Sequence, residues 1–177
     1  MTRLLHISAR AGLLAAASVL AGCVTLMDEL EPGTPVAEIQ QRYGEPTARC
    51  PLPEGAGERL IWSRQPLGQY AWGVDVAPDG KTGAVRSLLT DENFARLSSG
   101  YWPAERVRCE FGPPAEIREV GHGQARQTVW NYRYKNRGGW PSLLTVHMGP
   151  DGKTARRYES NDDPNAASNG PGSGGSE

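Results

Sequence analysis

Pro150-Asp151-Gly152-Lys153-Thr154 repeats Pro78-Asp79-Gly80-Lys81-Thr82 without a change, at an offset of 72 residues. Each copy contains an Asp-Gly pair, which predicts a tight turn between two strands because Gly tolerates the positive φ that such turns require. Further matches precede both copies in the same order. The pentapeptide therefore predicts that the chain contains two related units.

The matches before the turns follow an offset of 68. They pair Pro35 with Pro103, Ile39 with Val107, Tyr43-Gly44-Glu45-Pro46 with Phe111-Gly112-Pro113-Pro114, and Ile61-Trp62 with Val129-Trp130. The change of offset from 68 to 72 places a four-residue insertion near residues 136–139. A hairpin loop tolerates such an insertion, so the length change fits the proposed duplication.

Each unit is predicted to begin with a short amphipathic helix. The signals are a Pro in the first turn, apolar residues at helical spacing and a Gly at the end. They fall on Pro35, Val36, Ile39, Tyr43 and Gly44 in the first unit, and on Pro103, Val107, Phe111 and Gly112 in the second. Before the second unit, Thr90 is a candidate N-cap for an additional helix that includes Phe94 and Leu97.

After each helix the pattern changes to the alternation of a strand. One face carries Tyr70, Trp72, Val74 and Val76 in the first unit, and Leu144, Val146 and Met148 in the second. Each unit is thus predicted to be one or two helices followed by three antiparallel strands. The predicted fold class is α+β, with the helices packed on one face of each sheet.

The N-terminus is predicted to be an export signal. Arg3 precedes an apolar stretch that is too short to cross a bilayer, and Leu20-Ala21-Gly22-Cys23 follows it. This tetrapeptide resembles the lipobox of bacterial lipoproteins, whose cysteine is acylated and becomes the mature N-terminus. By the same resemblance Val24, in place of Asp, favours the periplasmic face of the outer membrane. The alternative is an ordinary signal cut near Ala17-Ser18, which would leave Cys23 as a free thiol.

Charge and the other two cysteines are consistent with export. From Cys23 onward, 17 Lys and Arg stand against 20 Asp and Glu, so the chain lacks the basic surplus of a nucleic-acid-binding protein. In an oxidising compartment Cys50 and Cys109 either form a disulfide or remain as two buried small apolar groups. The sequence leaves both possibilities open.

A set of motifs in the second unit resembles the SmpA/OmlA family of small outer-membrane lipoproteins, also called BamE. The motifs are a lead-in at 89–97, a helix ending in Phe111-Gly112-Pro113-Pro114, a Trp130-Asn131-Tyr132 strand and an Asp151-Gly152-Lys153 turn. The resemblance covers roughly 90–158 and extends more loosely over 31–88. It implies a helix-helix-sheet domain that accompanies the β-barrel assembly machinery. A typical member has one such domain, and a tandem pair also resembles the β-lactamase inhibitor protein in layout.

The predicted organisation follows from these boundaries. It comprises a signal peptide (1–22), a lipidated tether (23–32), two BamE-like units (33–88 and 89–160) and a disordered tail (161–177) that lacks large apolar residues.

Catalytic motifs are missing from the sequence, which contains no nucleophile elbow, zinc-binding helix, phosphate loop or dinucleotide fingerprint. His147 alternates with apolar residues and is predicted to be a surface strand residue, and His122 a loop residue. Asp79 and Asp151 are turn residues and not calcium ligands. We therefore predict a non-enzymatic protein without metal or cofactor.

The segment from Trp130 to Arg137, with Trp140 after it, is the predicted interaction surface. Aromatic and Arg side chains anchor many protein interfaces. The residues assigned to partner binding are Arg133, Tyr134, Lys135, Arg137 and Trp140. The leading hypothesis is an outer-membrane-anchored lipoprotein that assists outer-membrane protein assembly or envelope integrity. The alternative is a periplasmic module that captures an enzyme or a soluble ligand on its sheet.

Overall fold

The computed structural model describes Met27 and residues 30–166. The signal peptide, Cys23 and residues 167–177 lie outside the described residues. The fold is α+β, as predicted. In the described part of the chain it consists of three α-helices and two four-stranded antiparallel sheets.

The first sheet has the strand order β1-β2-β3-β4 and follows helix α1 in the chain. Its elements are α1 (Val36–Tyr43), β1 (Ala48–Pro51), η2 (Pro53–Gly55), β2 (Glu58–Ser63), β3 (Ala71–Val76) and β4 (Arg86–Ser87). The second sheet has the order β5-β6-β7-β8. Its elements are α2 (Asp91–Ala95), η3 (Arg96–Ser98), α3 (Ala104–Phe111), β5 (Glu116–Val120), η4 (Gly123–Ala125), β6 (Gln127–Lys135), β7 (Pro141–Met148) and β8 (Ala155–Asp162).

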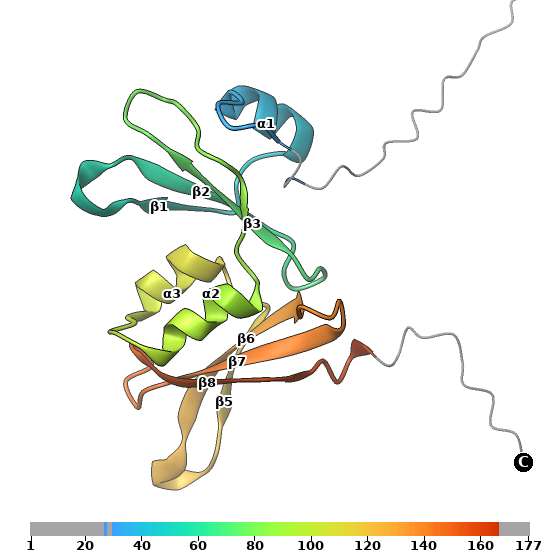
Figure 1. The fold of residues 1–177 in the computed structure, drawn as a ribbon. Coiled ribbons are helices and arrows are strands. Elements are labelled where there is room, and N and C mark those ends of the chain that lie inside the picture. Colours follow the sequence, from blue (N-terminus) through green and yellow to red (C-terminus); the bar gives the residue numbers. More distant parts are fainter. Residues whose placement is uncertain (1–26, 28–29, 167–177) are drawn as a thin grey trace, which may run out of the picture.

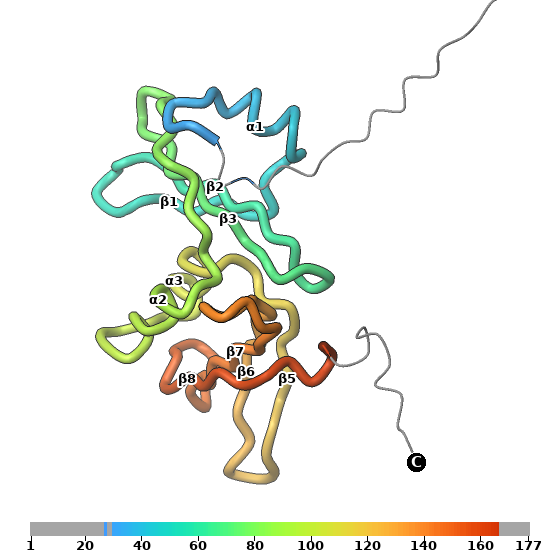
Figure 2. The backbone as a smooth tube through the Cα atoms, turned by 45° about the vertical axis from the view of Figure 1, so that its right-hand side comes forward, coloured from blue at the N-terminus to red at the C-terminus, as the bar shows by residue number. Residues whose placement is uncertain are grey.

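The helices and sheets form four stacked layers (Figures 1 and 2). Helix α1 covers one face of the first sheet, where Ile39 packs in one core with Trp62 and Trp72. Helices α2 and α3 lie between the two sheets. A second core joins Ile61 of the first sheet, Phe111 of α3 and residues of the second sheet. The order of the layers is therefore α1, first sheet, α2 with α3, second sheet.

The prediction of three strands per sheet, with helices on one face only, is wrong. The strands β1 and β5 directly follow the helices and pair with β2 and β6, which adds a strand to each sheet. The first sheet is covered on both faces because its second face carries the small residues Ala71 and Gly73. A Cβ built on Gly73 would lie 2.8 Å from Cδ2 of Leu88. The absence of a side chain at Gly73 therefore allows Leu88 to pack closely against β3.

The helix ends are formed as their sequence signals predict. Gly44 and Gly112 end α1 and α3 with φ of 80° and 82°, a conformation that favours Gly. The side chain of Thr90 accepts a hydrogen bond from the backbone N–H of Asn93 and so caps α2. Helices α1 and α3 consequently begin and end within about a residue of their predicted positions. Helix α2 begins after Thr90 as predicted but ends at Ala95, and Leu97 lies in the 3-10 helix η3 that follows.

The chain remains ordered beyond the predicted start of the tail at residue 161. Strand β8 continues to Asp162, where it pairs with Ser142. The next residue, Asp163, has a fully buried carboxylate that accepts a 2.7 Å hydrogen bond from Nε of Arg133. The pairing and this ion pair extend the second unit past its predicted end.

Candidate functional site

The junction between the two sheets, which we call the waist, is crosslinked by a disulfide. Cys50 on β1 and Cys109 on α3 are bonded, with their Cα atoms 5.7 Å apart. Of the two possibilities that the sequence leaves open, the structure has the bonded one. Because the two cysteines are 59 residues apart, the bond ties the first sheet to the helical layer of the second unit.

An ion network reinforces the waist beside the disulfide. Arg59 of β2 is only 8% exposed and donates two hydrogen bonds to Asp75, at 2.6 and 3.2 Å. It also donates to Glu110 at 3.2 Å and to the carbonyl oxygen of Cys109 at 3.3 Å. Burial by itself lowers the pKa of Arg59, but the hydrogen bonds and charges of Asp75 and Glu110 outweigh that effect and raise it. The guanidinium therefore remains charged and links the two units.

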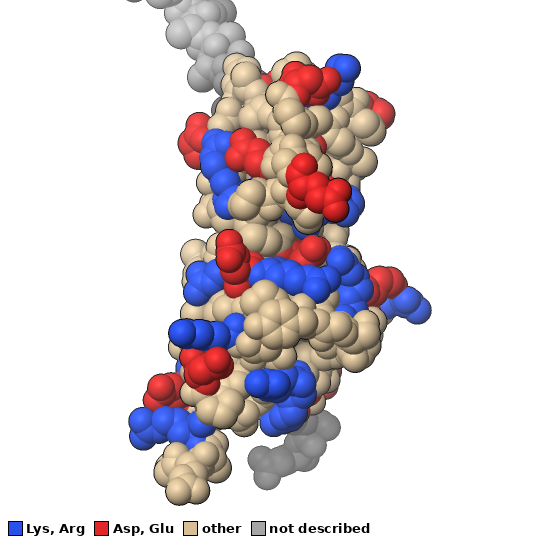
Figure 3. Space-filling view, turned by 90° about the vertical axis from the view of Figure 1, so that its left-hand side faces the viewer, with Lys and Arg blue, Asp and Glu red and all other residues tan. Residues whose placement is uncertain are grey.

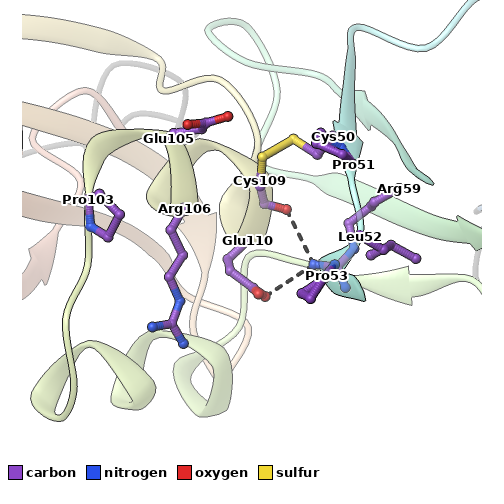
Figure 4. A pocket seen from close by; sticks show the side chains of 10 residues that line it. All are labelled: Cys50, Pro51, Leu52, Pro53, Arg59, Pro103, Glu105, Arg106, Cys109 and Glu110. Carbon is purple, nitrogen blue, oxygen red and sulfur yellow. Dashed lines mark hydrogen bonds and ion pairs between the residues drawn. A yellow bond between two sulfur atoms is a disulfide. The ribbon is translucent and has the colours of Figure 1, made fainter. Parts of the chain in front are cut away.

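A cavity of about 380 Å³ opens at the waist. Pro51, Leu52 and Pro53 form its wall on the first unit, and Pro103, Glu105 and Arg106 form its wall on the second. Figure 4 shows the disulfide and the contacts of Arg59 with Glu110 and the Cys109 carbonyl between these walls. Figure 3 shows charged side chains of both signs in a band across this side of the molecule. With the Arg59 and Glu110 charges already paired, the cavity offers mostly apolar contact.

One face of the second sheet points away from helices α2 and α3 (Figure 1), and we call it the open face. Strand pairing places Glu116, Asn131, Thr145 and Glu159 in one row across its four strands. The side-chain amide of Asn131 donates to Glu116 at 3.2 Å, and the hydroxyl of Thr145 donates to Oδ1 of Asn131 at 3.1 Å. Cross-strand hydrogen bonds thus hold these side chains in place.

His147 lies in the neighbouring row and is 5% exposed, so its predicted surface position is wrong. The ring is covered because both of its nitrogens are engaged. Nε2 lies 2.9 Å from Glu159, and Nδ1 lies 3.1 Å from a guanidinium nitrogen of Arg157. The hydrogen bond with His147 lowers the pKa of Glu159. This arrangement links two strands and leaves neither ring nitrogen available to another group.

Two hairpin loops meet at another edge of the molecule, on the right of Figure 1, and we call this surface the hairpin end. It consists of loop 64–70, between β2 and β3, and loop 136–140, between β6 and β7. The side chain of Gln65 donates to the Arg133 carbonyl at 2.6 Å and accepts from the Arg133 N–H at 3.3 Å. This paired contact fixes the first loop against the second unit.

The structure divides the five predicted partner-binding residues into two groups. Tyr134 is 1% exposed, so its predicted exposure is wrong. It shares the inner face of β6 with Trp130 and Tyr132, packs edge-on against Phe94 and donates to Asp91 at 2.8 Å. Burial raises its pKa to about 12. Arg133 is partly buried by its ion pair with Asp163.

The remaining three residues lie at the hairpin end with exposed side chains. Trp140 is 71% exposed, Lys135 lies over the ring of Tyr70, and Arg137 forms an ion pair with Glu92. Sequence reasoning missed Leu67, which is 93% exposed in loop 64–70. An apolar residue inside Gln65-Pro66-Leu67-Gly68, a turn-like stretch between two strands, was the signal that could have found it.

Within Met27 and 30–166, no group of three or more His, Cys, Asp or Glu residues could hold a metal ion. The same residues contain no helix that is long and apolar enough to span a bilayer.

Comparison with known proteins adds little to this description. No protein-family model and no curated protein matches the sequence. A crystal structure of a DUF4309 family protein (YjgB) from Bacillus subtilis is similar at 17% identity, with a TM-score of 0.24. The similarity covers 72% of this chain and 76% of that one. A TM-score this low carries no argument, and the resemblance to SmpA/OmlA stays a prediction.

Proposed function

We propose that this protein is a lipid-anchored periplasmic lipoprotein of the outer membrane that assists outer-membrane protein assembly or envelope integrity without catalysing a reaction. The observation that carries the proposal is the Leu20-Ala21-Gly22-Cys23 sequence directly after a signal-length apolar stretch. A cysteine acylated at this point would hold the folded units close to the bilayer.

The folded part of the chain supports this assignment in two ways. The Cys50–Cys109 disulfide suits an oxidising compartment, because such bonds are rare where thiols are kept reduced. The hairpin end presents exposed apolar and basic side chains on a fixed framework, which suits a protein that is held against a membrane. β-Barrel assembly proteins are the partners that the SmpA/OmlA resemblance suggests.

The open face of the second sheet favours a second candidate function, the capture of a periplasmic enzyme or soluble ligand. Its row of Glu116, Asn131, Thr145 and Glu159 offers ordered donors and acceptors on a sheet. Because cross-strand hydrogen bonds hold two of these side chains in place, a ligand would meet a surface that needs little further ordering.

We also propose that the two units arose by duplication, as the repeated turns and glycine helix ends suggest. Trp62 and Trp130 support this proposal, because each packs in the core between its sheet and the helices that precede that sheet in the chain. Trp62 lies on the side of α1, and Trp130 carries the guanidinium of Arg108 from α3 over its ring.

The test of the anchoring is a Cys23→Ala variant of the full chain. The wild type is expected to carry acyl groups at Cys23 and to float with membranes, whereas the variant is expected to be released or misprocessed. Mass spectrometry of the N-terminal peptide and membrane flotation measure both properties. A Cys23→Ala chain that stays in the membrane fraction with the same processing would overturn the lipoprotein assignment.

The partner is tested separately by crosslinking in intact cells and purifying the lipoprotein from membranes. Barrel-assembly components among the crosslinked proteins support the leading proposal. A single soluble periplasmic enzyme, lost on Thr145→Lys in the open face, supports the second candidate instead.

A further inference from the structure

The hairpin end displays the two most exposed large apolar side chains of the described residues. Leu67 is 93% exposed and Trp140 is 71% exposed, and each lies in a loop that projects from a strand pair. The paired hydrogen bonds between Gln65 and Arg133 hold loop 64–70 against strand β6, which leads into loop 136–140. Both apolar side chains are therefore presented on one surface.

Two basic residues lie in or directly beside these loops. Arg64 and Lys135 are exposed, and neither forms an ion pair within the part of the chain that the structure describes. Trp is enriched at the level of lipid headgroups because its ring is apolar and its N–H is polar. Lys and Arg beside it can meet lipid phosphates. This combination of side chains is typical of a surface that contacts a bilayer.

Met27, the described residue that follows the proposed anchor in the chain, packs in a core that reaches the hairpin end. Cys23 is four residues before Met27, a length that spans at most about 14 Å when fully extended. Met27 is buried, at 2% exposure, in the same core as Tyr70. Tyr70 ends the loop that carries Leu67, and Nζ of Lys135 lies 5.9 Å from the centre of its ring. The tether and the hairpin end are thus joined through one cluster of side chains.

We propose that the hairpin end rests on the bilayer that holds the acyl anchor, with Leu67 and Trp140 among the lipid headgroups and Arg64 and Lys135 facing lipid phosphates. The inference rests on the proposed acylation of Cys23, which keeps the bilayer within reach. It goes further by giving the anchored protein a fixed orientation on the membrane.

A lipid surface suits this patch better than a protein partner does. A stable protein interface buries about 800 Å² on each side and needs a well-packed centre. Two separate apolar side chains among basic ones do not supply such a centre. They can, however, insert individually between lipids, where no complementary shape is required.

The five tryptophans make the proposal directly measurable. Trp62, Trp72, Trp102 and Trp130 are at most 7% exposed, so Trp140 is the tryptophan that a bilayer can reach. The full lipidated chain is reconstituted in vesicles of phosphatidylcholine containing about one phosphatidylglycerol in four, with or without brominated acyl chains. Brominated lipid is expected to quench the wild-type fluorescence, and Trp140→Phe is expected to lose most of that quenching.

A second variant serves as the matched control. Tyr101 is 68% exposed in the segment that joins η3 to α3. In Figure 1 this segment lies on the left, whereas the hairpin end lies on the right. Adding Tyr101→Trp to Trp140→Phe restores an exposed tryptophan at a site where no quenching is expected. Wild-type fluorescence that brominated lipid leaves unchanged, or equal quenching at both sites, would overturn the proposed orientation.

The outcomes separate this inference from the proposed function. Mass spectrometry of the reconstituted protein first establishes whether Cys23 is acylated. If Cys23 carries no acyl group, the anchoring proposal itself is wrong. An acylated protein whose Trp140 is not quenched leaves the anchoring intact and defeats the orientation. Shielding of Trp140 by a crosslinked protein, and not by lipid, assigns the surface to a protein partner and also defeats the orientation.

Discussion

At the scale of single residues, Tyr134 and Trp140 illustrate how one hairpin provides both core and surface. Tyr134 lies on the inner face of β6 and contacts Phe94, with 4.8 Å between the ring centres. Trp140 follows the turn of the same hairpin and is mostly exposed. Tyr134 and Trp130 are four residues apart on β6, so their side chains point to the same face of the sheet. Because that face is buried, the alternation of the strand accounts for the burial of Tyr134. The assignment of Tyr134 to partner binding neglected this alternation.

Truncating these two residues is expected to give opposite results. Tyr134→Ala should lower the free energy of unfolding by about 3–5 kcal/mol, because it removes a buried ring. Trp140→Ala should change it by no more than about 0.5 kcal/mol, as is usual at exposed positions. Urea unfolding followed by circular dichroism measures both values. Similar losses for the two variants would contradict the assignment of Trp140 to the surface.

At the scale of elements, the helices were predictable and the first strand of each sheet was not. Thr90, Gly44 and Gly112 act over one turn of chain, so their sequence signals are local and reliable. Strand β1 has only four residues, and β5 reads Glu-Ile-Arg-Glu-Val without a continuous apolar face. Both are edge strands, and their pairing with β2 and β6 depends on distant residues that no local pattern reveals.

The candidate sites likewise contain some features that the sequence predicts and others that it does not. The cysteine pair and the exposed positions of Lys135, Arg137 and Trp140 could be anticipated from composition and from the insertion near 136–139. The contact of Gln65 with Arg133 and the network around Arg59 could not. Gln65 and Arg133 are 68 positions apart, and Arg59 and Glu110 are 51 positions apart. Each pair joins different layers, with no spacing that marks it.

The two helix-ending glycines provide a matched test of packing between layers. Gly44 and Gly112 have nearly the same φ, but a Cβ on Gly44 meets nothing within 4 Å, whereas one on Gly112 lies 3.2 Å from Cγ2 of Ile61. Gly44→Ala should cost about 1–3 kcal/mol from backbone strain alone. Gly112→Ala should cost about 1 kcal/mol more, because Ile61 must also move.

Thermal and urea unfolding of both variants measure the difference. Equal costs would mean that α3 and the first sheet are not in tight contact at Gly112.

At the scale of the whole molecule, the waist determines whether the two sheets behave as one body. Helices α2 and α3 share a core with both sheets, and Arg59 joins Asp75 of the first sheet to Glu110 of the helical layer. The disulfide adds a covalent link at the same place. These contacts predict that the two units unfold together.

Removing the disulfide tests that prediction. A Cys50→Ala/Cys109→Ala variant should lose about 4 kcal/mol of stability, since the bond closes a loop of 59 residues in the unfolded chain. Wild-type protein treated with a reductant is the control and should lose a similar amount. A loss of unfolding free energy below about 1 kcal/mol would show that the ion network and the apolar contacts stabilise the waist without the disulfide.

The polar row of the open face affects whether another layer can pack on the second sheet. A stack of alternating helical and sheet layers can continue at any end that presents an apolar surface, as in repeat proteins whose terminal modules need a polar outer side. Here Asn131, Thr145 and Glu159 lie where a further helical layer would dock, and polar side chains give such a layer nothing to bury. The row thus disfavours the packing of a further apolar layer, or of an apolar surface of another copy, on this face of the second sheet.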